Sequence, residues 1–243
     1  MEAPVFRINE AHDAERLAAV FKIHGRLHIA DFLESTGANN LLRFLDTTDS
    51  WKLLFNSGER LFELDREIQA NQSAEQRWLL DRAVYSKARN AFQYRYETIR
   101  VPDADACRLA RGTIVDAFAR FMSQEPAQAF LRTVIGDTDI GFADAQATAY
   151  GPGHFLTAHD DNVAGKNRRA AYVLNLSREW PADWGGLLVF SDPGEAIAEA
   201  FVPAFNALNL FAVPQRHSVS MVTPFAPRRR YSITGWLRSG ARP

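Results

Sequence analysis

The sequence predicts an α+β protein in which helices pack on a jelly-roll-like double sheet. Residues 9–135 mostly show the spacing of amphipathic helices, whereas from about residue 140 short apolar runs alternate with Gly, Pro, Asn and Asp. Many short strands at this spacing are typical of a sandwich or a barrel. We expect one domain over residues 1–243, with helical support over about 1–135 and a jelly-roll core over about 136–243.

Caps and glycines locate the helices of the first part. Asn9 is a candidate N-cap for a helix that ends at Gly25. Ser73 to Gln76 reads Ser-Ala-Glu-Gln, which is the pattern of a capping box at the start of a second helix. Apolar residues at helical spacing predict one long helix over Cys107–Met122, and Pro126 favours the start of another.

Strand-like runs account for most of the second part of the chain. Two short ones also lie in the first part, at 27–29 and 51–55. The others are 140–150, 155–159, 170–176, 187–191, 208–213, 217–223 and 231–237, with breakers at 151–153, 185–186 and 192–194. Seven runs bounded by such breakers favour a double sheet over a helical bundle.

Composition excludes several classes of protein. The chain has 243 residues, 47% of them hydrophobic and 23% charged, with a formal net charge of -1. That balance gives no electrostatic drive toward nucleic acid or an anionic membrane, so we expect neither as a partner. The single cysteine, Cys107, excludes an intrachain disulfide framework and a zinc site built from cysteines. Without a basic segment followed by an apolar run near Met1, or an apolar stretch of roughly 18 residues, we expect a cytoplasmic protein.

One histidine stands in a pattern that suits a metal. His159 is followed by Asp160 and Asp161, and alternate residues of a strand point to the same side. His159 and Asp161 can therefore reach one ion, and His217 at the start of a distant strand can supply a third ligand. Two histidines and one carboxylate form the facial triad of non-haem Fe(II) oxygenases, which leaves positions open for a cosubstrate and O₂.

An arginine completes the pattern. Arg230 begins the run Arg-Tyr-Ser-Ile-Thr-Gly-Trp, which follows His217 along the chain. An arginine on a strand behind the metal would hold a carboxylate through a bidentate pair. A 2-oxoacid cosubstrate with a second carboxylate needs such an anchor. Arg228 points to the same face of the strand two residues earlier and is the alternative anchor.

The segment Tyr150–Phe190 resembles the core of the 2-oxoglutarate/Fe(II)-dependent prolyl hydroxylases. It is most similar to the branch that includes the ribosomal and the hypoxia-inducible-factor prolyl hydroxylases. The shared pieces are a tyrosine before a turn, His-X-Asp, a strand ending in Leu-Asn, and Trp-Gly-Gly before an apolar strand. Residues 203–206, His217-Ser-Val and Arg230–Trp236 continue the resemblance in the same order, so it covers roughly residues 140–238.

The resemblance implies a double-stranded β-helix (jelly roll) flanked by N-terminal helices, and it implies roles for single residues. His159, Asp161 and His217 would bind Fe(II). Arg230 would pair with the distal carboxylate of 2-oxoglutarate. Three further residues match family positions near the cosubstrate: Tyr172, Tyr150 and Thr234.

The implied activity is that of a dioxygenase that uses Fe(II), 2-oxoglutarate and O₂, with ascorbate as a possible auxiliary reductant. It would hydroxylate a prolyl residue in a protein or peptide and release succinate and CO₂. Hydroxylation of a free amino acid or another small molecule would need the same machinery and stays open. A non-catalytic jelly-roll binding module is the third reading, although an intact triad and arginine argue against it. The polar, basic segment 162–169 suits a mobile rim over an entering polypeptide, so we expect an open groove.

Overall fold

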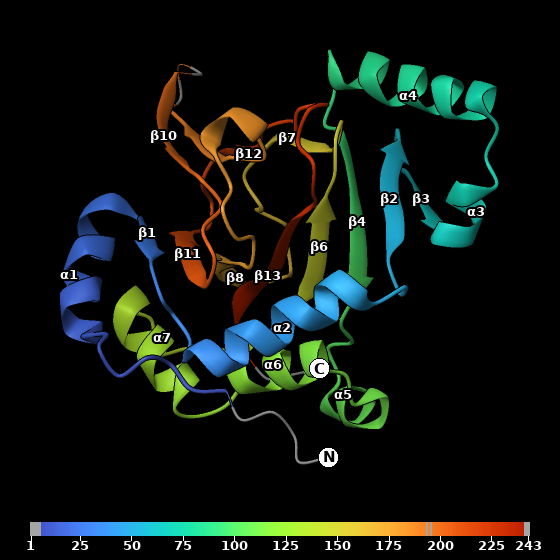
Figure 1. The fold of residues 1–243 in the computed structure, drawn as a ribbon. Coiled ribbons are helices and arrows are strands. Elements are labelled where there is room, and N and C mark those ends of the chain that lie inside the picture. Colours follow the sequence, from blue (N-terminus) through green and yellow to red (C-terminus); the bar gives the residue numbers. More distant parts are fainter. Residues whose placement is uncertain (1–5, 193, 195, 241–243) are drawn as a thin grey trace.

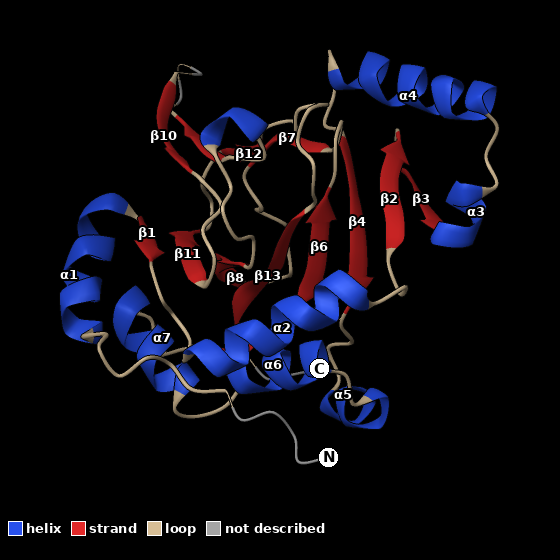
Figure 2. Cartoon of the chain, viewed as in Figure 1, coloured by secondary structure: helices blue, strands red, loops and turns tan. Residues whose placement is uncertain are grey.

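The computed structural model describes residues 6–192, 194 and 196–240, and within them it confirms the predicted α+β jelly roll (Figures 1 and 2). The strands form one 13-stranded sheet whose main path is β1-β11-β8-β13-β6-β4-β7-β12-β9-β10. Strands β2 and β3 extend the sheet beside β4, and β5 pairs with β13. Every pair between these strands is antiparallel.

The elements follow one another in a largely alternating order at first and then as a run of strands. The strands are β1 (Arg26–Ile29), β2 (Lys52–Ser57), β3 (Arg60–Asp65), β4 (Tyr94–Arg100), β5 (Ile140–Ala143), β6 (Gln146–Tyr150), β7 (Phe155–His159), β8 (Arg168–Asn175), β9 (Leu188–Ser191), β10 (Ile197–Phe201), β11 (Ala207–Ala212), β12 (His217–Val219) and β13 (Arg230–Ser239). The helices are α1 (Ala14–His24), α2 (Ser35–Thr47), α3 (Arg66–Ala70), α4 (Ala74–Ala88), α5 (Asp105–Arg111), α6 (Ile114–Met122) and α7 (Ala127–Ile135), with a short 3₁₀ turn at Ala182–Trp184.

The two ends of the sheet meet, so the sheet curls into a nearly closed barrel. Arg26 on β1 forms an ion pair with Glu199 on β10, with 2.5 Å between Nε and Oε2. The rings of His28 and Phe201 lie 5.4 Å apart at the same junction. Side-chain contacts across this junction close the barrel around an interior space, which is lined by the inward-facing residues of the strands.

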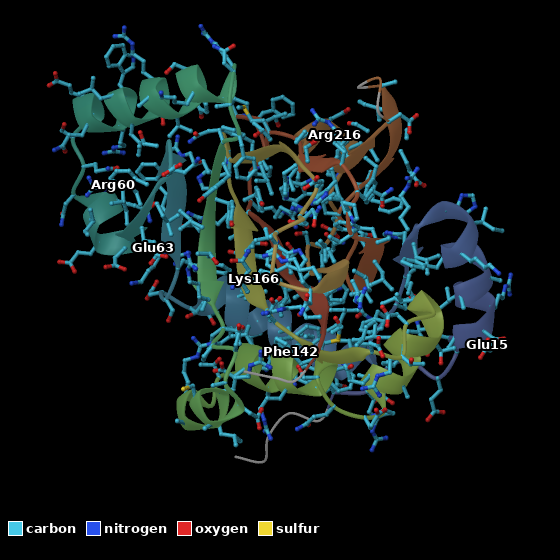
Figure 3. All side chains as sticks on the ribbon, turned by 180° about the vertical axis from the view of Figure 1, so that it is seen from behind. Glu15, Arg60, Glu63, Phe142, Lys166 and Arg216 are labelled. Atoms are coloured by element: carbon cyan, nitrogen blue, oxygen red, sulfur yellow. The ribbon has the colours of Figure 1, made fainter. Side chains whose placement is uncertain are left out.

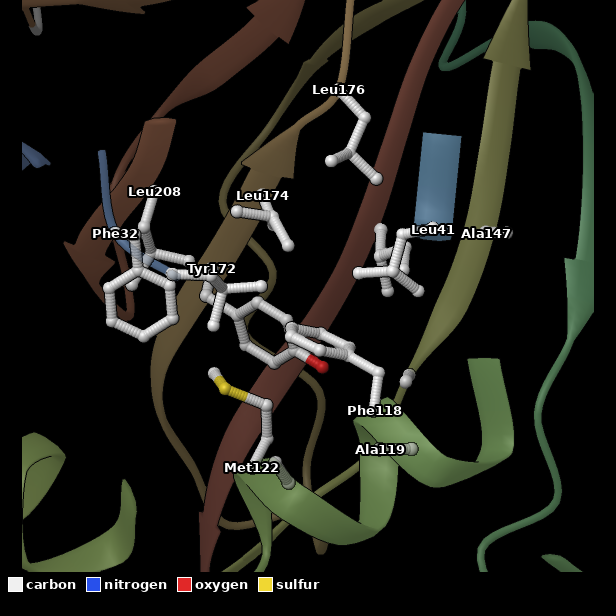
Figure 4. Close-up of a cluster of buried hydrophobic side chains, with 14 of the residues drawn as sticks. Phe32, Leu41, Phe118, Ala119, Met122, Ala147, Tyr172, Leu174, Leu176 and Leu208 are labelled. Carbon is white, nitrogen blue, oxygen red and sulfur yellow. The ribbon is translucent and has the colours of Figure 1, made fainter. Parts of the chain in front are cut away.

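Helices α1, α2, α6 and α7 cover one side of the sheet, while α3 and α4 lie beyond β2 and β3 (Figures 1 and 2). The main core lies between these four helices and the outward face of β6, β8, β11 and β13. Figure 4 shows Phe118 and Met122 of α6 against Leu174 and Leu208 of the sheet, all fully buried. Each such side chain contributes roughly 1.5–3 kcal/mol of burial free energy, so this layer holds the barrel rigid.

Two predicted helix boundaries were wrong. Helix α1 begins at Ala14 because the Asp13 carboxylate accepts hydrogen bonds from the backbone N–H groups of Glu15 and Arg16. Asn9 instead lies between the β-bridge at Ile8 and a turn at residues 10–11, and its N–H donates to the carbonyl of Phe32. The predicted end of α1 agrees with the structure, because Gly25 takes the left-handed conformation (φ 65°) at the helix end.

The predicted helix over Cys107–Met122 is two helices. Helix α5 ends at Gly112, which is left-handed with φ 64°. Thr113 then starts α6 through a capping box with Asp116. The capping box predicted at Ser73 is present at the start of α4, and α7 follows Pro126.

Four strands of the sheet, β1 to β4, come from the first part of the chain, so that part is less helical than its sequence pattern suggests. The strand-like runs given above do not include β3, β4 or β10, and the run 140–150 is divided into β5 and β6. No helix among the residues described is long and apolar enough to cross a membrane.

Candidate active site

A cavity of about 570 Å³ lies inside the barrel and opens to solvent at one end. We call it the central cavity. Its walls consist mainly of residues of β4, β6, β7, β8, β12 and β13, with further residues from β2, β3, β9 and β11. On β13, the side chains alternate between the cavity and the helices: Arg230 and Thr234 line the cavity, whereas Ile233 and Leu237 belong to the core beneath the helices.

Three side chains converge at the wall of this cavity. Strand β7 ends at His159 and strand β12 starts at His217, and the antiparallel register places these two residues directly opposite each other. Their ring centroids are 4.2 Å apart. The carboxylate of Asp161 lies 3.4 Å from Nε2 of His159 and 3.4 Å from Nε2 of His217. Within the described part of the chain, this is the one cluster whose ligand atoms all lie within metal-binding reach of one another, at most 4.8 Å apart.

Backbone carbonyls fix the orientation of both imidazoles. Nδ1 of His159 lies 3.0 Å from the carbonyl oxygen of Thr157, and Nδ1 of His217 lies 2.8 Å from that of Gln215. With a proton on Nδ1, each ring donates to its carbonyl and directs the Nε2 lone pair at the shared centre. Such outer hydrogen bonds are the usual support of histidine ligands.

The charges of the cluster suit a divalent cation. Burial, together with neighbouring His159, lowers the pKa of His217 to about 4, so this imidazole is neutral at pH 7. Burial by itself would raise the pKa of Asp161, but the interactions with the neighbouring His159 and His217 outweigh it, so the pKa lies below its usual value. Two imidazole nitrogens and one carboxylate therefore face a common point, and this donor set fits Fe(II).

Arg230 is buried behind the cluster without an acidic partner. The residue is 1% exposed, its Nη2 donates to Oδ1 of Asn175 at 3.3 Å, and its Nε has no hydrogen-bond partner within the described residues. The Tyr150 ring lies 5.2 Å from the guanidinium carbon. Burial lowers the pKa of Arg230 to about 10, so the group stays charged at pH 7. A desolvated cation with unused donors at a cavity wall fits the carboxylate of 2-oxoglutarate.

Arg228 points elsewhere. Its side chain is 48% exposed and lies 3.6 Å from the carboxylate of Glu179 on the surface. The geometry therefore favours Arg230 over Arg228 as the anchor, and Tyr150 and Thr234 also line the central cavity as expected.

Tyr172 also lines the central cavity, but its hydroxyl group already has a hydrogen-bond partner in the protein. Its hydroxyl donates to the carbonyl oxygen of Asp144 at 2.7 Å, and its ring packs against Phe118 in the core beneath the helices (Figure 4). On β8 the side chains of Ala171 and Val173 face the barrel and Asn175 contacts Arg230, whereas most of the Tyr172 ring lies on the opposite face of the strand.

Asn175 is the site residue that sequence reasoning missed. It is fully buried, contacts Arg230, and donates to the carbonyl oxygens of Val173 and Ala207 at 3.4 and 3.3 Å. The sequence did contain a signal for this residue. Asn175 is the asparagine of the Leu-Asn pair at the end of the strand, and its position determines which residues of the strand lie on the same face as Asn175.

An aromatic wall joins the mouth of the cavity to Arg230. The rings of Phe92, Tyr94, Tyr96 and Tyr150 follow one another with centroid separations of 5.6, 5.7 and 5.1 Å. Phe92 is 48% exposed and lies 5.4 Å from the ring of His159. This wall keeps water from one side of the cavity and offers apolar surface beside the metal cluster.

Comparison with known proteins agrees with this geometry. The family model described as the 2OG-Fe(II) oxygenase superfamily matches residues 145–238. Mouse prolyl 3-hydroxylase OGFOD1 is 36% identical over 89 residues, which are 34% of this chain and 16% of that protein. The match therefore spans about a sixth of the mouse protein.

Solved structures share the fold. A prolyl-4-hydroxylase from Pseudomonas putida has a TM-score of 0.60 at 16% identity, with 94% of this chain and 100% of that chain covered. A Trichoplax adhaerens prolyl hydroxylase, in complex with a peptide fragment of hypoxia-inducible factor, has a TM-score of 0.55 at 16% identity, covering 93% and 90%. The α-ketoglutarate-dependent epimerase SnoN has a TM-score of 0.57 at 14% identity, covering 95% and 85%.

The matched segment contains all three residues of the cluster and Arg230, and the fold of the whole chain agrees with it. Fe(II), 2-oxoglutarate and O₂ are the cofactor and cosubstrates of such an oxygenase. Over residues 145–238, which carry the cluster and Arg230, this chain is similar to the 2OG-Fe(II) oxygenase superfamily.

Proposed function

We propose that this protein is a 2-oxoglutarate-dependent dioxygenase that hydroxylates a prolyl residue within a protein or peptide. The observation that carries the proposal is the presence, in one cavity, of the His159–Asp161–His217 cluster and of the buried guanidinium of Arg230, whose Nε has no hydrogen-bond partner among the described residues. The sequence match to a prolyl 3-hydroxylase over 89 residues supports the choice of proline.

Different residues of the cavity bind the metal and the cosubstrate. His159, Asp161 and His217 would hold Fe(II), which together with 2-oxoglutarate and O₂ supplies the oxidising power to hydroxylate an unactivated C–H bond. Arg230 holds the distal carboxylate of 2-oxoglutarate, and Asn175 orients the guanidinium. Because Arg230 is fully buried, this ion pair forms away from water and fixes the cosubstrate in one direction.

The mouth of the cavity favours a polypeptide over a small amino acid. Its rim carries exposed apolar side chains, namely Leu61 at 42%, Phe92 at 48% and Val163 at 48%. A free amino acid would need charged partners for its ammonium and carboxylate groups, whereas a prolyl ring with flanking peptide suits an open apolar rim. The epimerase shows that this fold also serves other reactions, so oxidation of a small molecule is the second candidate.

The test compares substrates directly. Purified protein with Fe(II) and 2-oxoglutarate is given free L-proline, proline-containing peptides or no substrate, and succinate and hydroxylated product are measured. We expect succinate formation that depends on iron and 2-oxoglutarate, and +16 Da prolyl peptides. Turnover of free proline without peptide activity would favour the second candidate, and absence of succinate under all conditions would leave a binding module.

Two finer points belong to the same proposal. We propose that ascorbate sustains turnover by keeping the iron reduced, which is tested by the number of turnovers with and without it. We also propose a cytoplasmic location, supported by the absence of any cysteine pair in the 243-residue sequence. Fractionation of cells that carry the tagged protein tests the location.

A further inference from the structure

Strand β3 is an open edge of the sheet. It pairs with β2 and with no other strand in the described part of the chain. Its partner β2 is paired on both sides, because it also binds β4. An unpaired edge presents a row of free N–H and C=O groups, which another extended chain can pair with.

The hairpin register shows which residues present these groups. The two-residue turn at 58–59 joins Ser57 to Arg60, so these two residues form a hydrogen-bonded pair and the pattern alternates from there. The backbone groups of Leu61, Glu63 and Asp65 then point away from β2. The residue of β2 opposite Leu61 is Asn56. The carbonyl of Asn56 also points away from its partner strand, because it accepts a hydrogen bond from the side chain of Gln93 on the far side.

The open edge borders the central cavity. Leu61 lines the cavity together with residues of the metal cluster. Glu63 forms an ion pair with Arg100, another cavity residue, with 2.9 Å between Oε1 and Nε. Residues 160–163 line the same cavity, and they belong to the segment that carries Lys166. Viewed from behind, Arg60 and Glu63 lie to one side of Lys166 (Figure 3).

The other face of the hairpin holds the edge in place. The ring of Phe62 stacks on that of Phe55 at 5.2 Å, and Leu64 packs in the same cluster with Val84 of α4. The side chains of Leu61 and Glu63 point the opposite way, toward the cavity. The edge is therefore a fixed strand beside the cavity rather than a free hairpin tip.

We propose that the polypeptide substrate binds as an added strand on the open edge of β3, with backbone hydrogen bonds to Leu61 and Glu63. This inference rests on the proposed function, and it names how that substrate is recognised. A strand added at the ordinary spacing of about 4.8 Å continues the sheet along the rim of the cavity. Recognition through the backbone leaves flanking side chains largely free, while the target proline, which has no N–H to offer β3, turns toward the metal cluster.

The first test removes one N–H group. Glu63→Pro deletes the outward N–H at a position where the ladder to β2 does not use it, and Glu63→Ala is the matched control because both variants lose the ion pair with Arg100. The probe is a set of pooled dodecapeptides with one fixed proline, from which the best hydroxylated sequence is chosen. We expect the KM of that peptide to be about fivefold higher for the Pro variant than for the Ala variant, which is the effect of one ordinary hydrogen bond. Succinate formation without peptide should be equal in both.

The second test leaves the protein intact. Single backbone amides of the chosen peptide are N-methylated in turn, and turnover by the unaltered protein is measured. An added strand offers every second amide to β3, so we expect loss of turnover to alternate along the peptide on at least one side of the proline. This scan also decides the matter if Glu63→Pro does not fold.

The results distinguish failure of the added-strand proposal from failure of the proposed function. A scan without alternation, or equal peptide KM values for two folded variants of Glu63, overturns the added strand while leaving peptide hydroxylation in place. If no pooled peptide is hydroxylated while free proline is, the proposed function itself is wrong, and the added strand falls with it.

Discussion

At the scale of single residues, Arg230 is a buried charge that no acidic side chain among the described residues neutralises. It is fully buried, and Asn175 supplies only a neutral contact at 3.3 Å. A buried charge that loses its partner costs roughly 3–5 kcal/mol. We expect Arg230→Met to raise the KM for 2-oxoglutarate by about a hundredfold or more, measured by succinate release, because the carboxylate would enter the cavity unpaired.

Arg228 supplies the control for this prediction. Its side chain is half exposed and pairs with Glu179 at the surface, so Arg228→Met should leave the KM for 2-oxoglutarate unchanged. Binding of Mn(II), followed by calorimetry, should be nearly the same in both variants. The opposite result, with Arg228 affecting the cosubstrate and Arg230 not, would mean that the anchor lies two residues earlier on the chain.

The metal cluster offers a second comparison between neighbours. Asp161 faces both histidines, whereas the adjacent Asp160 is exposed and accepts a hydrogen bond from the N–H of Asn162. We expect Asp161→Ala to weaken Co(II) binding by more than about 100-fold, because loss of a ligand exceeds the 10–100-fold effect of losing an outer partner. Asp160→Ala should bind Co(II) normally. The visible absorption of bound Co(II) reports the result without any need for turnover, and normal binding by Asp161→Ala would contradict the assignment.

At the scale of elements, one face of strand β8 lies toward the barrel interior and the other packs against the core beneath the helices. Asn175 faces Arg230 in the barrel, and Tyr172 faces Phe118 beneath the helices. We expect Asn175→Ala to raise the KM for 2-oxoglutarate several-fold, because the guanidinium loses the contact that orients it. Tyr172→Phe should leave that KM unchanged and lower the free energy of unfolding by about 1 kcal/mol, the usual value of one lost hydrogen bond. Urea unfolding and succinate assays measure the two effects, and a cosubstrate defect in Tyr172→Phe would contradict the face assignment.

The elements also show what could be read from the sequence. Local chemistry was sufficient where one side chain fixes a boundary, as at Ser73 for α4 and Gly25 for α1. The break between α5 and α6 had a local signal as well, because Gly112 and the Thr113–Asp116 pair are an end and a start in sequence. Apolar spacing continues across that break, and the periodicity of 3.6 residues alone could not reveal it.

The start of α1 depended on a contact that the local sequence does not contain. Asn9 and Asp13 are both good N-cap residues, and the choice between them follows from a backbone bond of Asn9 to Phe32. In the same way, β3 and β10 form because β2 and β9 offer edges to them. Such strands are fixed by partners distant in sequence rather than by their own pattern.

The candidate site was more predictable than its surroundings. His159 and Asp161 share one segment, and the family resemblance placed His217 and Arg230 beside them. The residue on β8 that contacts Arg230 could not be predicted from residue type, since a tyrosine suited the expected role better than an asparagine does. The strand register, in which Asn175 lies opposite Ser232 of β13, is consistent with the contact between Asn175 and Arg230.

At the scale of the whole molecule, buried ionisable groups make the fold sensitive to acid. Burial, together with nearby Arg95, lowers the pKa of His154 to about 3, and its Nδ1 accepts a hydrogen bond from the N–H of Gly151. Burial also lowers the pKa of His217 to about 4. Burial raises the pKa of Asp144 to about 6, which acts in the opposite direction.

The signs of these shifts determine the net effect. For His154, whose ordinary pKa is 6.5, the unfolded chain binds a proton between pH 6.5 and about 3 that the folded chain excludes. Its contribution to stability is therefore complete above pH 6.5 and falls as the pH drops. The contribution of Asp144 to stability is largest below its ordinary pKa of 3.8 and is lost as the pH rises through about 6. Between these two pH values, the proton bound by folded Asp144 offsets the proton that one histidine excludes. The two histidines outweigh the one carboxyl group, and acid destabilises the molecule.

We therefore expect the free energy of unfolding of the metal-free protein to fall between neutral pH and about pH 4.5, with a slope on the order of 1 kcal/mol per pH unit. His154→Asn keeps an acceptor for the Gly151 N–H group but has no proton to gain, so its slope should be shallower by about the same amount. His24, which is exposed on the last turn of α1, is the matched control, and His24→Asn should keep the original slope. Urea unfolding at a series of pH values, followed by tryptophan fluorescence, measures all three slopes. If His154→Asn loses stability on acidification as steeply as the unaltered protein, then His154 is not the group that excludes the proton, and the acid sensitivity arises at the metal cluster.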